Sequence, residues 1–583
     1  MLHTLTRSLR ENKGPALVTV LLSALEVVFE IVIPLFMSNL IDFGIEGGSM
    51  AAVWKFGAFL LLLAAFQLST GVLAARIAAR ASVGFAANLR EDMYNNVQTF
   101  AFSNIDKFST ASIVTRLTTD TTNVQNAFQM LMRMAIRAPV MLIFSMIVSF
   151  RISRDISMTF LVILPILALA LFFIIRSVFP VFTRVFRTYD ELNNVVQENV
   201  RGIRVVKSFN QEQHEIGKFG AISERIYKDF SKGERLITLN APLMQFCIYT
   251  CMIIISWLGA KAIIASGNDP ALGLTTGNLT ALITYTMQIL SSLMMLSMVF
   301  AMLTISLSSA RRIAEVLEER SDIPQPEQPV MTVRDGAVDF DHVSFVYASK
   351  ADKKVLDDID LHIRSGETIG IIGGTGASKS SLVQLIPRLY DVTGGKLTLG
   401  GVDVRDYDLD TLRGVVAMVL QKNELFSGTI KENLRWGNEN ATDEELQHAC
   451  VLACADEFIS AMPDGYDTHI EQGGTNVSGG QNQRLCIARA LLKKPKVLIL
   501  DDSTSAVDTR TDAQIQQALS TYIPDTTKII IAQRISSVQN ADRIVVLDDG
   551  HIDAVGCHDE LLRTCEIYRE VYESQQKGGE DDA

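Results

Sequence analysis

The sequence has 583 residues, of which 48% are hydrophobic and 20% are charged, and its net charge is −12 at pH 7. This length exceeds that of one small domain, and the mixture of apolar and charged residues predicts a membrane part joined to a soluble part. The acidic balance excludes a typical nucleic-acid-binding protein, which presents a basic face, so no nucleic-acid partner is expected.

Six apolar runs in the first half of the chain are long enough to cross a bilayer. They cover about residues 16–41, 52–75, 135–150, 157–178, 241–265 and 279–303. The third run is short and is expected to extend back through residues 130–138. No small-residue cleavage site follows the first run, which indicates an uncleaved span rather than a signal peptide. We therefore expect a transmembrane domain of six helices over residues 1–317.

The connections between the predicted spans alternate in length and charge. Those after the first, third and fifth spans are short and carry few basic residues, whereas those after the second and fourth are long, polar and helical in period. Because basic residues concentrate on the cytoplasmic side, the N-terminus, the long connections and the C-terminal half are predicted to be cytoplasmic. Each long connection would form a helical arm that projects roughly 35 Å from the membrane, and such an arm needs a partner at its tip.

Two carboxylates, Glu26 and Glu30, lie one turn apart on the same face of the first predicted span. A carboxylate inside a membrane is costly and usually faces a polar cavity or a charged partner. One interpretation is a contact for cationic cargo. The other is a structural pair with Arg133, with Arg137 or with polar groups on a neighbouring helix, and the sequence leaves both open.

A change of composition follows the spans. Residues 318–335 hold Pro324, Pro326 and Pro329 among charged residues, which predicts a linker. Residues 336–573 alternate short β-rich runs with helical runs, which predicts an α/β domain. Residues 574–583 form an acidic tail that is expected to be disordered.

A glycine-rich stretch in the α/β domain follows an apolar strand and precedes a helix beginning near Ser381. Its residues are Gly373, Gly374, Thr375, Gly376, Ala377, Ser378, Lys379 and Ser380, and together with Ser381 they are the expected nucleotide-binding residues. Backbone N–H groups of such a loop bind phosphate oxygens, Lys379 would reach the β- and γ-phosphates, and Ser380 would ligate Mg²⁺. Further on, a buried strand ends in Asp501, an acid positioned to hold Mg²⁺ through water. ATP and Mg²⁺ are therefore the expected ligands.

The run from Val477 through Ser478, Gly479, Gly480 and Gln481 lies between these two nucleotide motifs. With this run in place, the chain resembles an ABC transporter of the exporter type over nearly its whole length. The resemblance implies a membrane α-helical domain of six transmembrane helices with long cytoplasmic helical arms, followed by an α/β phosphate-loop ATP-binding domain. It also implies a multi-pass protein of the cell membrane, in contact with lipid.

The resemblance assigns further roles. Tyr347 matches the aromatic residue that stacks on adenine, and Gln421 matches the glutamine that touches Mg²⁺ and the attacking water. Asp508 ends a loop, residues 505–508, that crosses the dimer interface. The run 478–481 is the signature, which acts on ATP held by a partner subunit. Two coupling helices, which dock on nucleotide-binding domains, are expected near Arg116-Leu117 and near residues 210–214.

Among the departures from the family pattern, three together bear on ATP hydrolysis. Asp502 stands where a glutamate usually serves as general base, and removing one methylene withdraws the carboxylate by roughly 1–1.5 Å. Gln533 replaces the switch histidine that contacts the γ-phosphate, and an amide cannot exchange a proton as imidazole does. Ser378 replaces a glycine, at a cost of about 1–3 kcal/mol if that residue must be left-handed. Together they describe a degenerate site that binds ATP and hydrolyses it poorly.

These features predict one subunit of a heterodimeric, multidrug-like exporter of amphiphilic small molecules. The partner would be a homologous half-transporter that carries the glutamate and the histidine, and the intact signature of this chain would complete the partner's catalytic site. ATP hydrolysis would then occur mainly at the partner's phosphate loop. Two alternatives are a homodimeric lipid or peptide flippase and a regulatory or channel-like ABC protein.

Overall fold

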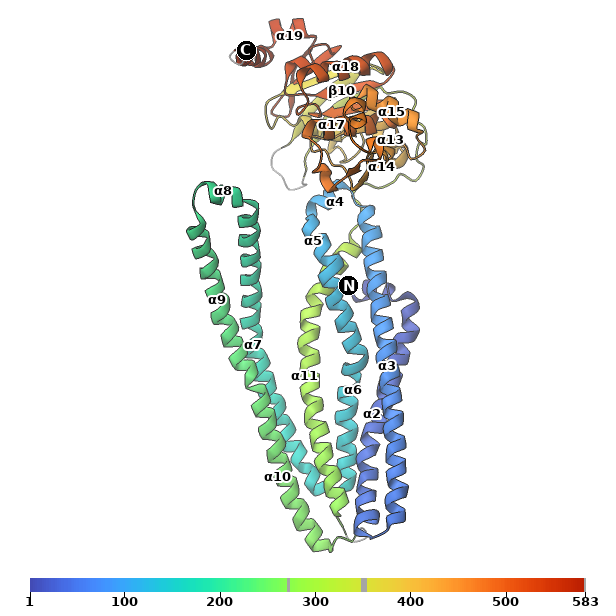
Figure 1. The fold of residues 1–583 in the computed structure, drawn as a ribbon, viewed down its shortest axis with the longest axis vertical. Helices are drawn as coiled ribbons and strands as arrows, with labels where there is room; N and C mark the ends of the chain where they lie inside the picture. Colours follow the sequence, from blue (N-terminus) through green and yellow to red (C-terminus); the bar gives the residue numbers. More distant parts are fainter. Residues whose placement is uncertain (270–272, 348–353, 581–583) are drawn as a thin grey trace. The chain divides into compact units, whose positions relative to one another are not determined.

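The computed structural model describes residues 1–269, 273–347 and 354–580. The chain divides into two units (Figure 1). The first, here called the helical unit, comprises Met1–Gln98 and Ser109–Glu319. The second, here called the α/β unit, comprises Thr99–Phe108 and Arg320–Ala583.

Six long helical stretches dominate the helical unit. They contain the helices α2 (Lys13–Asn39), α3 (Met50–Gln98), α6 (Thr121–Ile152), α7 (Arg154–Arg201), α9 and α10 (Glu212–Thr238 and Asn240–Ser266) and α11 (Thr276–Glu318). Within the described residues, these six stretches are long and apolar enough to cross a membrane, which confirms the six predicted spans. Shorter segments complete the unit: α1 (Leu2–Arg7), η1 (Arg10–Asn12), η2 (Leu40–Glu46), α5 (Thr110–Thr115), η3 (Arg116–Asp120) and α8 (Ile203–Ser208).

The spans bury one apolar face and leave another exposed. Phe160, Tyr285 and Ile289 are fully buried in one cluster, and the Tyr285 hydroxyl donates to the carbonyl of Ile31 at 2.6 Å. In contrast, Trp54 and Trp257 are 73% and 68% exposed. Large apolar side chains on the outside of long helices are favourable when they face lipid or a partner protein.

The helical arms continue directly from the spans. α3 has 49 residues and α7 has 48, so each is about 70 Å long at 1.5 Å per residue. Figure 1 shows α7 and α9 side by side as a hairpin with α8 at its tip. The hairpin is held by an apolar cluster of Val195, Ile222 and Ile226 and by an ion pair of 2.6 Å between Arg225 and Glu191.

The α/β unit contains two larger sheets in its described part. The six-stranded sheet has the order β12-β11-β3-β10-β9-β6, and the four-stranded antiparallel sheet has the order β2-β1-β4-β5. In the first sheet, β6, β9, β10, β3 and β11 are parallel to one another and β12 is antiparallel to β11. Every residue of β9 and β10 is buried, as expected for parallel strands covered on both faces.

The strands and helices of this unit have the following bounds. The strands are β1 (Val338–Phe345), β2 (Leu356–Ile363), β3 (Thr368–Gly373), β4 (Gly394–Leu399), β5 (Val402–Asp403), β6 (Val416–Val419), β9 (Val497–Asp501), β10 (Thr527–Ile531), β11 (Arg543–Asp548) and β12 (His551–Gly556). The longer helices are α15 (Asp443–Leu452), α17 (Gly479–Leu492), α18 (Thr509–Tyr522) and α20 (Glu566–Glu580), and the shorter ones include α12 (Lys379–Gln384), α13 (Leu409–Val415), α14 (Ile430–Arg435), α16 (Asp456–Ser460) and α19 (His558–Thr564).

One helix from the first arm belongs to the α/β unit. α4 (Phe102–Lys107) places Phe102 6.0 Å from Tyr390, between ring centroids, and the Tyr390 hydroxyl donates to Asp106 at 2.8 Å. The first coupling helix was expected near Arg116-Leu117, whereas the part of the arm that belongs to the α/β unit is α4, earlier in the chain. Arg116 lies buried in the helical unit, where it donates to the carbonyl of Arg312 at 2.6 Å. The sequence misled because no proline or glycine marks the turn.

The predicted disorder of the acidic tail is also wrong at its beginning. Helix α20 continues through Gln575, whose side chain forms two hydrogen bonds with the α/β unit. The reason is an apolar helical stripe before the tail: Tyr568 is fully buried, and Val571 and Tyr572 pack against the core. This stripe anchors the helix, so its polar continuation stays helical.

Candidate nucleotide site

The phosphate-binding loop connects β3 to α12, as its sequence predicts. β3 lies between β10 and β11, so the loop leaves from the middle of the parallel sheet. A side chain on Gly373 would collide with the carbonyl oxygen of Leu547, which explains the glycine there. Lys379 Nζ donates to the carbonyls of Gly373 and Gly374, both at 2.8 Å. The lysine is thus held over the loop whose N–H groups bind phosphate.

Ser378 adopts the left-handed conformation, with φ 67° and ψ 22°. The left-handed conformation on which the predicted energetic cost of Ser378 depends is therefore present. A non-glycine residue in this region carries a penalty of about 1–3 kcal/mol relative to an unstrained backbone. The loop keeps its shape because β3 and α12 hold both of its ends.

The first acid after β9 faces the loop. Ser380 Oγ donates to Asp501 Oδ1 at 3.0 Å, so two of the three residues predicted to contact Mg²⁺ lie side by side. Burial raises the pKa of the Asp501 carboxyl above its usual value, although the hydrogen bond from Ser380 acts in the opposite direction. A hydroxyl and a carboxylate oxygen are the hard ligands that Mg²⁺ prefers, so the residues fit this ion. Bound there, Mg²⁺ would neutralise charge that develops on the phosphates.

The second acid, Asp502, is bracketed by amides. Its backbone is left-handed, with φ 50°, a region that aspartate tolerates better than most residues. Gln533 Nε2 donates to Asp502 Oδ2 at 2.8 Å. Burial raises the pKa of the Asp502 carboxyl, whereas hydrogen bonds from Gln421 and Gln533 lower it. Three residues singled out from the sequence therefore meet at one carboxylate.

Tyr347 lies beside the helix that follows the loop. Its hydroxyl is 2.7 Å from Ser381 Oγ, and its ring meets Tyr390 edge to face with centroids 5.1 Å apart. Tyr347 is 44% exposed, which leaves aromatic surface available for stacking.

The signature run forms the N-terminus of α17. Ser478 caps this helix: its Oγ accepts from the N–H of Gln481 at 3.3 Å, and Gln481 Oε1 accepts from the N–H of Ser478 at 2.9 Å. A side chain on Gly480 would lie 2.8 Å from the carbonyl oxygen of Ala506. The glycine therefore lets the signature approach the loop 505–508 closely.

One residue of this region escaped the sequence analysis. Gln483 Oε1 accepts from the N–H of Ala506 at 3.0 Å, and its Nε2 donates to Ser505 Oγ at 3.2 Å. The buried glutamine joins the signature helix to the loop 505–508. Asp508, at the end of that loop, caps α18 by accepting from the N–H of Thr511 at 2.9 Å. Gln483 lies two residues after the signature run, and this position was the sign in the sequence that could have identified it.

In the helical unit, the intramembrane carboxylates have a partner. Arg137 Nη1 lies 2.9 Å from Glu26 Oε1, and its Nη2 lies 2.7 Å from Glu30 Oε2. A side chain on Gly71 would lie 3.2 Å from Glu26 Oε1, so this glycine makes room for the pair. This is the structural pairing weighed against a cargo contact, with Arg137 rather than Arg133 as the cation.

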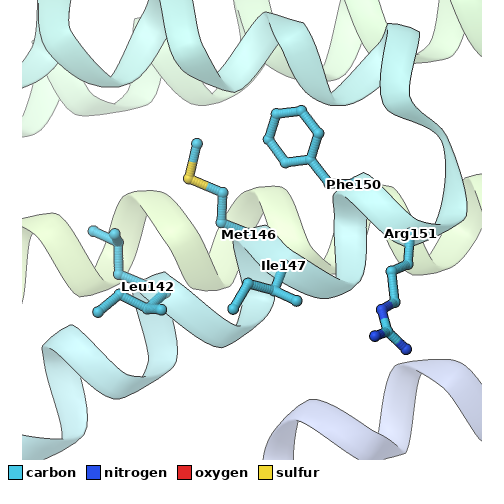
Figure 2. Close-up of a pocket in the computed structure, with 6 residues that line it drawn as sticks. Leu142, Met146, Ile147, Phe150 and Arg151 are labelled. Atoms are coloured by element: carbon cyan, nitrogen blue, oxygen red, sulfur yellow. The ribbon is translucent and has the colours of Figure 1, made fainter.

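A separate apolar hollow lies along α6 (Figure 2). Its lining residues are Leu142, Ile143, Met146, Ile147, Phe150 and Arg151. Figure 2 shows Arg151 at the end of the row of apolar side chains. The hollow suits an apolar chain better than a cation, because the lining includes a guanidinium and no carboxylate.

A phosphate-binding loop and a buried acid on a parallel sheet, in one chain with six membrane-crossing helices, define an ATP-driven membrane transporter. Two family descriptions match this chain: "ABC transporter transmembrane region" over residues 16–294 and "ABC transporter" over residues 356–505. The chain belongs to the ABC transporter family. It has the domain content of a half-transporter, with one transmembrane domain and one nucleotide-binding domain.

Known proteins resemble the chain over nearly its full length. An uncharacterized ABC transporter ATP-binding protein of Bacillus subtilis, YfiB, is 35% identical over 96% of this chain and 96% of its own. A second uncharacterized ABC transporter ATP-binding protein, from Mycobacterium tuberculosis, is 33% identical over 99% and 98%. A solved bacterial Atm1-family ABC exporter with ATP bound has the same fold, with a TM-score of 0.80 at 24% identity over 97% and 98% of the two chains.

The family settles several predictions. The chain is a multi-pass membrane protein with a cytoplasmic nucleotide-binding domain. Its ATP-binding domain couples ATP hydrolysis to transport and uses ATP with Mg²⁺.

Proposed function

We propose that this chain is one subunit of a heterodimeric exporter, and that its own phosphate-loop site holds ATP and hydrolyses it slowly. The observation that carries this proposal is the hydrogen bond of 2.8 Å from Gln533 to Asp502. The carboxylate in the general-base position is short by one methylene, and one of its oxygens is occupied by a neutral amide. A base misplaced by 1 Å can lose about a hundredfold in rate.

The signature side of the chain supports the other half of the proposal. Ser478 and Gln481 form a complete capping box at the start of α17, and the helix N-terminus favours an anion. This surface would act on ATP held by a partner chain that carries the glutamate and the histidine. Binding of ATP at both shared sites would close the nucleotide-binding domains, and hydrolysis at the partner's site would release them.

The tip of the second arm supports docking on a partner. α8 and its neighbours expose Val205 and Phe209, which are 60% and 71% exposed. Exposed apolar side chains at the end of a polar arm mark an interaction surface. We place the second coupling contact here, on the nucleotide-binding domain of the opposite subunit.

Hydrolysis assays test the division of labour. The purified chain alone should hydrolyse ATP slowly, and its complex with the partner should be much faster. The double substitution Asp502→Glu with Gln533→His should raise the rate of the chain alone, by up to about a hundredfold. Fast hydrolysis by the unmodified chain alone, abolished by Asp502→Asn, would refute the proposal.

The cargo we propose is an amphiphilic small molecule. Two carboxylates share one guanidinium in the span, so the group carries one excess negative charge when both acids are ionised. A cationic amphiphile could take up that charge, in competition with Arg137. Transport assays with a matched cationic and neutral pair test this: Glu30→Gln should reduce transport of the cation alone.

The hollow beside Arg151 favours a second candidate, a homodimeric lipid flippase. An apolar groove that ends in a guanidinium fits a lipid tail with an anionic head group. Cross-linking of two differently tagged copies of this chain distinguishes the assemblies. Efficient linkage between the tags in the absence of any other half-transporter would favour the homodimer.

A further inference from the structure

The C-terminal helix reaches the nucleotide site through one glutamine. Gln575 Nε2 donates to the carbonyl of Gln533 at 2.7 Å, and Gln575 Oε1 accepts from the N–H of Ile535 at 3.0 Å. The amide thus bonds the backbone on both sides of Arg534. Two hydrogen bonds from one planar group fix the direction of this segment as well as its distance.

The segment that Gln575 holds, residues 533–535, also directs the Gln533 side chain toward Asp502. The Gln533 side chain leaves from the residue whose carbonyl Gln575 holds, and its Nε2 lies 2.8 Å from Asp502 Oδ2. On the far side, η7 (Ile535–Ser537) begins, and Gln575 satisfies its first free N–H. The other end of η7 is tied to α18, because Ser537 Oγ donates to Asp512 Oδ2 at 2.5 Å.

Gln575 is itself held in place by the core. Tyr568 is fully buried and lies seven residues earlier, on the same face of α20. Its hydroxyl is 2.8 Å from His558 Nδ1, and Tyr572 packs against the same core cluster. A firmly anchored helix can therefore impose a position on the loop it touches.

We propose that Gln575 is a positioning residue for the γ-phosphate side of the nucleotide site. It acts through the backbone of Gln533, which occupies the switch position. The proposal rests on the switch role of Gln533 and is independent of the partner's identity. Loss of the two Gln575 hydrogen bonds should weaken contacts to the γ-phosphate and leave contacts to the β-phosphate unchanged.

The test compares two nucleotides on the purified full-length chain. In Gln575→Ala, the Mg²⁺ complex of the non-hydrolysable imido analogue of ATP should dissociate on the order of tenfold faster, as two lost hydrogen bonds predict. Dissociation of MgADP, which has no γ-phosphate, should not change. Gln576→Ala is the matched control, because Gln576 donates to Tyr572 within the same helix at 2.6 Å and should leave both rates unaltered.

A pH series separates positioning from a general structural role. In Gln575→Glu, the ionised carboxylate can accept from Ile535 but cannot donate to Gln533, so release of the imido analogue should be fast at pH 7. A protonated carboxyl has one donor and one acceptor, as the amide does. The ratio to the unmodified chain should therefore return toward one as the pH falls through the glutamate pKa. Equal acceleration of MgADP release, unchanged release in Gln575→Ala, or no recovery at acidic pH would overturn the proposal.

Discussion

Substitution of Arg137 tests how the membrane span tolerates its two carboxylates. Arg137→Met removes both ion pairs, of 2.9 Å and 2.7 Å, and leaves Glu26 and Glu30 facing each other on one helix face. The Glu26 side chain is only 10% exposed, so water compensates little. Removing one partner of a buried ion pair costs about 3–5 kcal/mol, and we expect a loss of this size in the free energy of unfolding.

The matched control removes all three charges. Glu26→Gln with Glu30→Gln and Arg137→Met leaves no uncompensated ion, so its loss should be clearly smaller than that of Arg137→Met alone. Both variants can be compared with the unmodified chain by denaturant unfolding in detergent micelles. If Arg137→Met is as stable as the triple variant, the carboxylates do not depend on the guanidinium, and our account of the pair is refuted.

Three further predictions concern the nucleotide-binding domain. Ser378→Gly relieves the left-handed strain and should stabilise the domain by up to about 1 kcal/mol, after allowance for glycine's unfolded-state entropy; a loss in thermal stability would contradict this. Gly480→Ala places a methyl group 2.8 Å from the carbonyl oxygen of Ala506, so hydrolysis in the assembled transporter should fall sharply while ATP binding to this chain's own loop remains. Burial raises the pKa of the Asp502 carboxyl, so at a pH near this pKa the folded state binds more protons there than the unfolded state. The contribution of Asp502 to the free energy of unfolding should therefore increase as the pH falls from the raised pKa toward the usual aspartate value. Asp502→Asn should remove this pH-dependent contribution.

Local chemistry made much of the molecule predictable. A bilayer of fixed thickness demands long apolar helices, so the six spans could be read directly from hydropathy. The phosphate loop follows from glycine's conformational freedom and from the lysine and serine that come after it. Even the strain at Ser378 could be anticipated, because the loop geometry dictates a left-handed residue whatever side chain stands there.

Contacts between segments that are far apart in the chain could not be predicted from the sequence. The Arg137 pairing joins residues 107 and 111 positions apart, and either of two arginines fitted the pattern. α4 rather than Arg116 packs on the α/β unit, because an arm of uniform helical period does not mark its own turn. Gln575 was assigned to a disordered tail, since polar composition alone gives no sign that a buried tyrosine two turns earlier holds the helix.

The sequence by itself thus determined the class of protein and its nucleotide chemistry, because these depend on short motifs and on the thickness of the membrane. Only the tertiary structure decided which side chains hold one another. It brought Gln533 to Asp502 and Gln575 to the loop behind it. Such contacts depend on where the strands and helices pack, and the spacing of residues along the chain does not determine which side chains come within hydrogen-bond distance.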